Sequence, residues 1–326
     1  MHGNDGRHMN LGEWALLFAL SLLWGGSFFF AKVALRELPP FTVALGRVGL
    51  AAATLGLVLA VLRQGLPRLR ALWGAFLVMG LLNNLAPFSL IFWGQTTLTA
   101  GHAAILNATM PLFTVIVAHV TTTEERITPA KLAGMLAGFG GVVVMIGPGL
   151  AVVDRAFWAQ VACLSAAFCY ACAGVFGRRF RRLGVAPLQT AFGQLAATTL
   201  MLVPVVFIVD RPSLQGLAHP ATLGALAGLA ILSTALAYVV YFRLLATAGA
   251  TNLSLVTLLI PASAALLGYA FLGERLGPGH LAGMSLIAAG LAAIDGRPLT
   301  ALSALLPALL RPDARARVAT DGDAEG

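Results

Sequence analysis

Long apolar runs dominate this chain, and short polar segments separate them. A transmembrane helix needs about 20 mainly apolar residues, because the hydrocarbon core of a bilayer is about 30 Å thick. The runs alternate with turn sequences such as Leu-Pro-Pro (38–40) and Gly-Pro-Gly (147–149). We therefore predict spanning helices over residues 11–33, 41–62, 71–92, 99–119, 129–147, 156–176, 187–209, 221–243, 251–271 and 279–295.

One eleven-residue pattern occurs twice. Residues 125–135 read Glu-Arg-Ile-Thr-Pro-Ala-Lys-Leu-Ala-Gly-Met, and residues 274–284 read Glu-Arg-Leu-Gly-Pro-Gly-His-Leu-Ala-Gly-Met. Seven of the eleven positions are identical at an offset of 149 residues. Each copy follows an apolar run interrupted by a proline, Pro111 or Pro261. Such a duplication in an apolar chain is typical of transporters built from two homologous halves.

Each half contains five predicted spans, so the second half enters the membrane in the opposite orientation. With the N-terminus in the cytoplasm, 15 Lys and Arg residues lie on the cytoplasmic side and 5 on the other, and Arg47 lies within a span. Cytoplasmic loops carry the excess of basic residues, so we predict that both termini are cytoplasmic. The predicted fold is an all-α integral membrane protein with ten transmembrane helices as two inverted five-helix repeats. Its parts are a polar N-terminal tail (1–10), the two repeats (11–147 and 156–296) and a C-terminal cytoplasmic tail (297–326).

Composition agrees with a lipid environment. Charged residues make up 10% of the chain and hydrophobic residues 59%, whereas soluble domains carry about 25% charged residues. The net charge of +8 is not accompanied by an aromatic–basic motif, so the lipid bilayer, not nucleic acid, is the expected partner. Cys169 and Cys172 have CxxC spacing, but no second pair completes a metal site, and we expect neither a metal nor a cofactor.

Several motifs together resemble the EamA family of the drug/metabolite transporter superfamily. Besides the doubled proline and Glu-Arg pattern, they are Leu-Leu-Trp-Gly-Gly-Ser-Phe (22–28), Gly-Arg-Val (46–48), Ala-Leu-Ala-Tyr-Val-Val-Tyr-Phe-Arg (235–243) and Gly-Glu-Arg-Leu (273–276). The resemblance covers about residues 11–296. It implies ten spans, both termini inside, and secondary transport, usually efflux of small metabolites such as amino acids. It also implies a central cavity lined by spans one to four and six to nine. The extra Glu124 departs from the family pattern and makes the end of span four more polar.

The two prolines are the first candidate site. A proline within a helix cannot donate to the carbonyl four residues back, and its ring displaces that carbonyl. The carbonyls freed by Pro111 and Pro261 belong to Asn107 and Thr257. Matched interrupted helices indicate a transport site. The alternative is a packing kink whose carbonyls bond to neighbouring hydroxyl groups.

Polar residues within spans are further candidates. Asn83 and Asn84 lie about 100° apart on a helix, so both avoid lipid only if that helix is packed among others. They either contact substrate or join helices. Arg47 could bind a substrate carboxylate through its fork of donors. It could equally extend outward to the membrane surface, or pair with Glu37. Gln194 is its counterpart in the second half.

Aromatic and histidine residues complete the candidates. Trp24 and Ser27 share one helical face, as do Tyr238 and Tyr241, and each pair suits either an amphipathic ligand or ordinary packing. His102, near the outer end of span four, could carry protons or simply be solvated.

Two sequence features bear on coupling and assembly. All 13 Asp and Glu residues lie in tails, loops or span ends, which argues against coupling through a buried carboxylate. Gly134 and Gly138 form a GxxxG motif, which brings two helices together either within one chain or between the chains of a homodimer.

We predict a secondary transporter of a small-molecule substrate in the bacterial cytoplasmic (inner) membrane. It would export amino acids or related compounds by alternating access. A passive channel or facilitator is the nearer alternative. An intramembrane enzyme is the other, but Ser27 has no mid-span histidine to activate it, and the chain has no HExxH motif or buried Asp pair, so we do not expect an enzyme.

Overall fold

The computed structural model describes residues 9–65, 69–121, 127–147, 153–212, 216 and 219–295. This part of the chain consists of helices and short connections and contains no strand. Glu124, Glu125 and Arg126 lie outside the described residues, as do the C-terminal tail and most of the N-terminal one.

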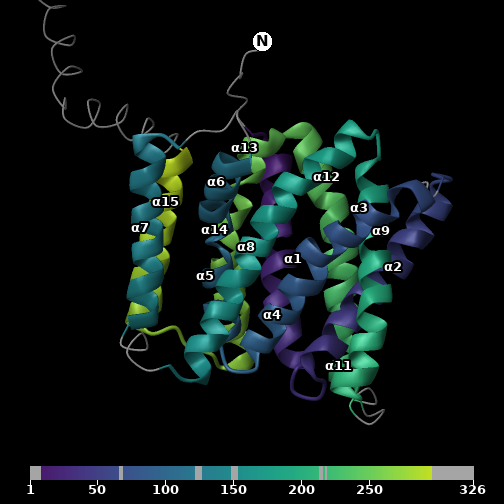
Figure 1. Ribbon diagram of the computed structural model, residues 1–326. Helices are drawn as coiled ribbons and strands as arrows, with labels where there is room; N and C mark the ends of the chain where they lie inside the picture. The colour runs from purple at the N-terminus through teal and green to yellow at the C-terminus, as the bar shows by residue number, and fades with distance from the viewer. Residues whose placement is uncertain are drawn as a thin grey trace, which may run out of the picture.

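Figure 1 shows the helices running roughly side by side across the molecule. Those of the first half are α1 (Leu11–Ala34), α2 (Pro40–Val61), α3 (Leu69–Gly80), η1 (Leu81–Leu85), α4 (Ala86–Gln95), α5 (Ala100–Asn107), α6 (Met110–Thr121) and α7 (Pro129–Ile146). Those of the second half are α8 (Arg155–Arg182), α9 (Pro187–Val205), η3 (Val206–Asp210), α11 (Pro220–Ala227), η4 (Gly228–Leu236), α12 (Ala237–Thr247), α13 (Gly249–Leu253), α14 (Val256–Leu272) and α15 (Pro278–Asp295). The η segments are π-helical.

Seven helical passages within the described residues are long and apolar enough to cross a membrane. They are Leu11–Ala34, Pro40–Val61, Leu72–Gln95, Ala100–Thr121, Arg155–Arg182, Pro187–Asp210 and Pro220–Thr247. Three shorter apolar helices, Lys131–Ile146, Val256–Leu272 and Pro278–Ile294, occupy the positions predicted for spans five, nine and ten. An all-helical membrane protein is therefore confirmed, whereas the number of ten spans stays a prediction.

Local sequence explains where many helices begin. Asn10 accepts a hydrogen bond from the Glu13 amide, and the Glu13 carboxylate accepts one from the Asn10 amide, each at 2.9 Å. This reciprocal cap satisfies amides that a helix start leaves free. Thr99, Thr128 and Asp154 cap α5, α7 and α8 in the same way, through one side-chain oxygen each.

Helix neighbours are reproduced when the two halves are exchanged. Helix α2 packs against its counterpart α9, and α7 against its counterpart α15. The contact of α1 with α14 is matched by that of α8 with α6, and the contact of α2 with η4 is matched by that of α9 with η1. This exchange of neighbours is what a pseudo-twofold axis in the membrane plane produces.

Helices α7 and α15 form a pair at one edge of the bundle (Figure 1). A Cβ atom placed on Gly134 would lie 2.6 Å from the Gly290 carbonyl oxygen, and one on Gly141 would lie 2.7 Å from the Gly283 carbonyl oxygen. The two backbones therefore touch, which only glycine permits. The GxxxG motif thus makes its contact within one chain and gives no support to a homodimer.

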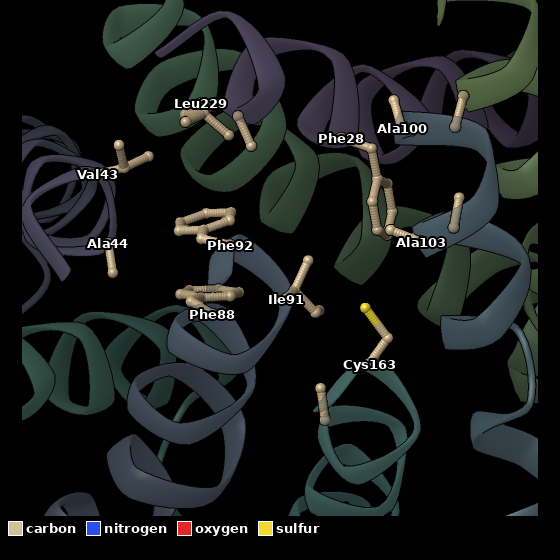
Figure 2. Close-up of a cluster of buried hydrophobic side chains, with 14 of the residues drawn as sticks. Phe28, Val43, Ala44, Phe88, Ile91, Phe92, Ala100, Ala103, Cys163 and Leu229 are labelled. Carbon is tan, nitrogen blue, oxygen red and sulfur yellow. The ribbon is translucent and has the colours of Figure 1, made fainter. Parts of the chain in front are cut away.

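The largest buried apolar cluster joins both halves. Figure 2 shows Phe88 and Phe92 of α4 stacked beside Val43 and Ala44 of α2, with ring centroids 6.0 Å apart. Phe28, Ile91, Ala100, Ala103, Cys163 and Leu229 extend the cluster to α1, α5, α8 and η4. Since these residues pack from six passages, they fix the helices that carry the polar residues described next.

Candidate functional site

Two π-helical segments occupy corresponding places in the two halves. An offset of 149 residues carries η1 (Leu81–Leu85) onto residues 230–234, which lie inside η4. A π-helical turn bonds each amide to the carbonyl five residues back and occurs often at functional sites. At the start of η1 the Gly80 carbonyl accepts a hydrogen bond from Thr198 Oγ1 of α9 at 3.1 Å. The widened turns thus direct backbone and side-chain polar groups toward neighbouring helices.

Arg47 of α2 lies buried in the bundle, with 7% of its surface exposed. Its Nε donates to Thr234 Oγ1 of η4 at 3.0 Å, and its Nη1 donates to Ser27 Oγ of α1 at 2.9 Å. The guanidinium carbon lies 3.9 Å from the ring centroid of Phe88. Among the described residues no carboxylate lies within 4 Å of the guanidinium, so the predicted alternative of a pair with Glu37 is wrong. Arg47 points inward.

A guanidinium has five N–H donors, and these two hydrogen bonds use one on Nε and one on Nη1. Both N–H groups of Nη2 are left for another acceptor. A buried cation that lacks a counter-charge is costly unless an anion joins it. Arg47 therefore has the properties of an anion-binding group.

An amide and phenol network lies beside Arg47. Asn83 Nδ2 donates to Gln194 Oε1 at 3.0 Å and to Tyr238 Oη at 3.3 Å, and Gln194 Nε2 donates to the same Tyr238 oxygen at 3.3 Å. Because Tyr238 Oη accepts two hydrogen bonds, its own O–H stays available as a donor. Tyr238 and Tyr170 of α8 lie in the neighbourhood of Arg47. The Arg47 guanidinium and the Tyr238 hydroxyl group thus each keep a free N–H or O–H donor in one buried cluster.

The cluster combines equivalent positions of the two halves. Arg47 and Gln194 are repeat counterparts on α2 and α9, and Asn83 and Thr234 lie in the matched segments η1 and η4. We call Ser27, Arg47, Asn83, Gln194, Thr234 and Tyr238 the central polar cluster. Asn84 is fully buried next to it, donates to Thr198 Oγ1 at 3.3 Å and leaves its Oδ1 without a hydrogen bond.

Other predicted site residues lie elsewhere. Trp24 packs against Tyr241 with ring centroids 5.6 Å apart, in a separate apolar cluster with Leu17 and Leu20. Tyr238 and Tyr241 share α12, but Tyr238 reaches η1 and α9 whereas Tyr241 contacts α1. Phe242 contacts both rings, with centroids 5.9 Å from Tyr238 and 5.3 Å from Tyr241, and so joins them.

The predicted helix break is present at Pro111 but not at Pro261. In the first half the chain breaks between α5, which ends at Asn107, and α6, of which Pro111 is the second residue. In the second half the break lies between α13 and α14, and Pro261 lies within α14, buried against α1. Thr257 Oγ1 bonds to the Ser254 carbonyl at 2.7 Å beside that break.

Close packing explains the position of Pro261. A Cβ atom placed on Gly25 of α1 would lie 2.6 Å from Ser263 Cβ and 3.1 Å from the Ile260 carbonyl oxygen, so α1 and α14 meet at the turn that contains the proline. Asn107 Oδ1 at the end of α5 is buried without a hydrogen-bond partner. No hydrogen bond given for the described residues joins Asn107, Thr257 or either proline to the central polar cluster.

Sequence reasoning did not select Phe88, Tyr170, Thr234 or Gln194 as site residues. Gln194 was visible as the counterpart of Arg47. Alignment of the repeats could thus have found one of them. Phe88 and Tyr170 gave no such signal, because aromatic residues are common throughout apolar helices.

Comparison with known proteins agrees with this architecture. The EamA-like transporter family matches twice, over residues 12–147 and 157–294. The uncharacterized transporter YoaV of Bacillus subtilis is 24% identical over 277 residues, which are 84% of this chain and 94% of that protein. The uncharacterized inner membrane transporter YedA of Escherichia coli is 28% identical over 265 residues, 80% of this chain and 83% of that one.

Two further likenesses are informative. A Salmonella typhimurium protein named "Probable amino-acid metabolite efflux pump" is 28% identical over 291 residues, which are 85% of this chain and 92% of that protein. A solved crystal structure matches the fold with a TM-score of 0.62 at 22% identity, over 87% of this chain and 96% of that one. With its apolar helices, its exchangeable halves and a family match over both of them, this chain belongs to the EamA-like transporter family.

Proposed function

We propose that this protein is a secondary transporter that exports amino acids or related carboxylate-bearing metabolites across the bacterial cytoplasmic membrane. Both termini lie in the cytoplasm, and substrate moves by alternating access between the two halves. The observation that carries the proposal is Arg47, a buried cation that bonds to two hydroxyl groups and has no carboxylate partner among the described residues.

The central polar cluster supplies the substrate site. Arg47 Nη2 and the Tyr238 O–H are donors without assigned acceptors, and a carboxylate accepts from both. Asn83, Asn84 and Gln194 offer amide groups at the same site for a polar or cationic portion of the substrate. This proposed set includes five of the residues predicted from sequence, which belong to α1, α2, η1 and α12: Ser27, Arg47, Asn83, Asn84 and Tyr238.

The charge distribution supports the orientation. Arg63, Arg178, Arg179 and Arg243 lie at the end of the bundle where α1 begins, because they sit near the ends of α2, α8 and α12. Basic residues favour the cytoplasmic side. The substrate class is supported further by the relative whose name describes amino-acid metabolite efflux.

Thermal unfolding of the purified protein in lipid nanodiscs tests the substrate class. Each amino acid is compared with its methyl ester and with the amine that lacks the carboxylate. A ligand at about 100 times its dissociation constant stabilises the folded state by about 2.7 kcal/mol. We expect stabilisation by at least one amino acid and by neither of its two analogues. Equal stabilisation by acid and ester, or by no amino acid, would contradict the proposal.

Counterflow in proteoliposomes then separates a carrier from a channel. Unlabelled substrate inside the vesicle should drive transient accumulation of labelled substrate, and the initial rate should saturate. Linear uptake without accumulation would show a passive pathway instead.

A further inference from the structure

A cavity of about 350 Å³ lies between α1 and α12, at the end of the bundle where α1 begins. It is lined by Asn10, Gly12, Glu13 and Leu16 at the start of α1 and by Arg243 and Thr247 of α12. Sites for small molecules commonly have volumes of about 300–1,000 Å³, so this cavity has room for one small ligand. In the proposed orientation it lies at the cytoplasmic end, from which an exporter takes its substrate.

The cavity carries one acidic and one basic side chain that do not pair with each other. Glu13 Oε2 accepts a hydrogen bond from the Asn10 amide at 2.9 Å, and its Oε1 accepts none from the described residues. The exposed Arg243 makes no side-chain hydrogen bond and no ion pair with the described part of the chain. No nitrogen of Arg243 lies within 4.0 Å of a Glu13 oxygen, so a space separates the two charged groups.

These two groups complement the head of an α-amino acid. An ammonium group donates hydrogen bonds to a carboxylate, and a guanidinium donates two parallel hydrogen bonds to a carboxylate. A zwitterion between Glu13 and Arg243 would meet both partners at once, whereas a simple anion or cation would meet a like charge on one side. Contacts with exposed charges are weak, which suits a site from which the substrate must move on.

A continuous set of contacts leads from the cavity to the central polar cluster. Leu16 lines the cavity and packs against the same apolar cluster as Tyr241. Tyr241 contacts Phe242 with ring centroids 5.3 Å apart, and Phe242 stacks on Tyr238 of the central polar cluster at 5.9 Å. Leu16 and Ser27 are 11 residues apart on α1, which is about 16 Å along its axis. The cavity and the central polar cluster are therefore separate sites on one route.

The charged cavity is not repeated in the other half. The positions equivalent to Arg243 fall at residues 94–96, which read Gly-Gln-Thr, and those equivalent to Glu13 fall at residues 158–162, which read Trp-Ala-Gln-Val-Ala. None of these residues is charged. The pair of charges thus occurs at one end of the pseudo-twofold arrangement, as expected of a site that takes substrate from one compartment.

We propose that Glu13 and Arg243 form a binding site for the ammonium and carboxylate groups of an amino acid, at which the exporter first binds its substrate on the cytoplasmic side. The inference rests on the proposed transport function and adds a second site to it. An ethanolamine phospholipid carries a similar pair of charges, so the test begins without that lipid.

Protection of an introduced cysteine tests the site. Thr247→Cys, at an exposed position of the lining, is made in a chain without the three native cysteines and placed in nanodiscs of phosphatidylglycerol. The rate of labelling by N-ethylmaleimide is measured with and without glycine, the smallest amino acid. At a glycine concentration of twice the dissociation constant the rate should fall about threefold, because free sites decrease by the factor 1 + [L]/Kd. Glycine methyl ester, which lacks the carboxylate, and acetate, which lacks the ammonium group, should leave the rate unchanged.

Two substitutions identify the groups that bind glycine. Glu13→Gln keeps the cap of α1, and both it and Arg243→Gln should abolish the protection. The matched controls Arg36→Gln and Glu37→Gln, at exposed charges near the other end of α1, should retain it. Each protein is compared with itself in the absence of glycine, so an effect of the substitution on the thiol cancels.

Four results would overturn the proposal. They are no protection of Thr247→Cys by glycine, equal protection by the methyl ester, retained protection in Glu13→Gln or Arg243→Gln, and protection that appears only when phosphatidylethanolamine is added. Stabilisation by an amino acid in the thermal screen without this protection would leave the proposed function standing. Absence of stabilisation by any amino acid would overturn the proposed function itself.

Discussion

Replacement of Arg47 by methionine should weaken substrate binding while it leaves the protein as stable as before. Methionine has a similar length and no charge, so the apolar contact with Phe88 is largely kept. Thr234 stays satisfied because its hydroxyl donates to the Leu229 carbonyl at 2.8 Å. Only Ser27 loses its partner. The substitution thus separates the ligand-binding role of the guanidinium from its packing role.

The magnitude follows from the contacts of Arg47. Two hydrogen bonds from a charged donor contribute about 1.5–3 kcal/mol each, and the position over Phe88 adds about 0.5–2 kcal/mol. Against them stands the desolvation of a buried guanidinium, which costs several kcal/mol. The terms nearly cancel, so the free energy of unfolding should stay within about 2 kcal/mol of the original value or rise. Binding loses at least one charge-assisted hydrogen bond, which is about 10-fold or more in the dissociation constant.

Two measurements check this on one preparation: denaturant unfolding in the absence of ligand, and titration with the amino acid found by thermal screening. Arg36→Met, at an exposed arginine, is the matched control and should change neither quantity. The contrary result is that Arg47→Met lowers the unfolding free energy by more than about 3 kcal/mol and leaves the affinity for the amino acid unchanged. A loss of that size is typical of a broken structural ion pair. Arg47 would then be a structural residue, and the substrate site would lie elsewhere.

Three further outcomes are expected. Gly134→Ala should destabilise the protein by about 1–3 kcal/mol, because the added Cβ would lie 2.6 Å from the backbone of α15. The control Gly140→Ala on the same helix should not destabilise the protein, because no atom lies within 4 Å of the added Cβ. Equal stabilities of the two variants would contradict the close contact between α7 and α15. Cysteines introduced at Thr128 and Gly277 should be labelled from opposite sides of the membrane, and labelling of both from one side would refute the inverted arrangement. Glu274→Gln keeps an acceptor for the amide at the start of α5 and should retain measurable counterflow. Loss of counterflow in a folded Glu274→Gln variant would show that transport requires a carboxylate.

The apolar runs predicted the helices well because lipid demands about 20 apolar residues whatever their neighbours are. The repeat likewise predicted which helices are equivalent. The side chains of Ser27, Asn83 and Tyr238 could be selected because polar atoms inside spans are rare and need partners. Which partners they have could not be predicted, since this depends on the packing of different helices, with partners 20 to 155 positions apart.

The errors have a physical cause in helix geometry. Pro261 was expected to interrupt a helix as Pro111 does, but it lies within α14, and the sequence alone does not show where along a passage the break falls. The π-helical turns of η1 and η4 change the direction of every side chain beyond them, so α-helical spacing does not describe the faces of these passages. The alternatives for Arg47 were left open for the same reason. Its orientation depends on Thr234, whose position is set by η4.

Helix length varies widely within this one bundle. Helix α8 has 28 residues and extends about 42 Å, whereas α7 and α15 have 18 each and extend about 27 Å. In the predicted arrangement of ten spans, a hydrocarbon core of about 30 Å exceeds the shorter length, so tilting would not relieve the mismatch of the α7–α15 pair and the bilayer would thin beside it. Hydrophobic mismatch then costs a fraction of a kcal/mol for each Å of added thickness. Longer lipid acyl chains should therefore strain the α7–α15 pair before they affect the rest of the bundle.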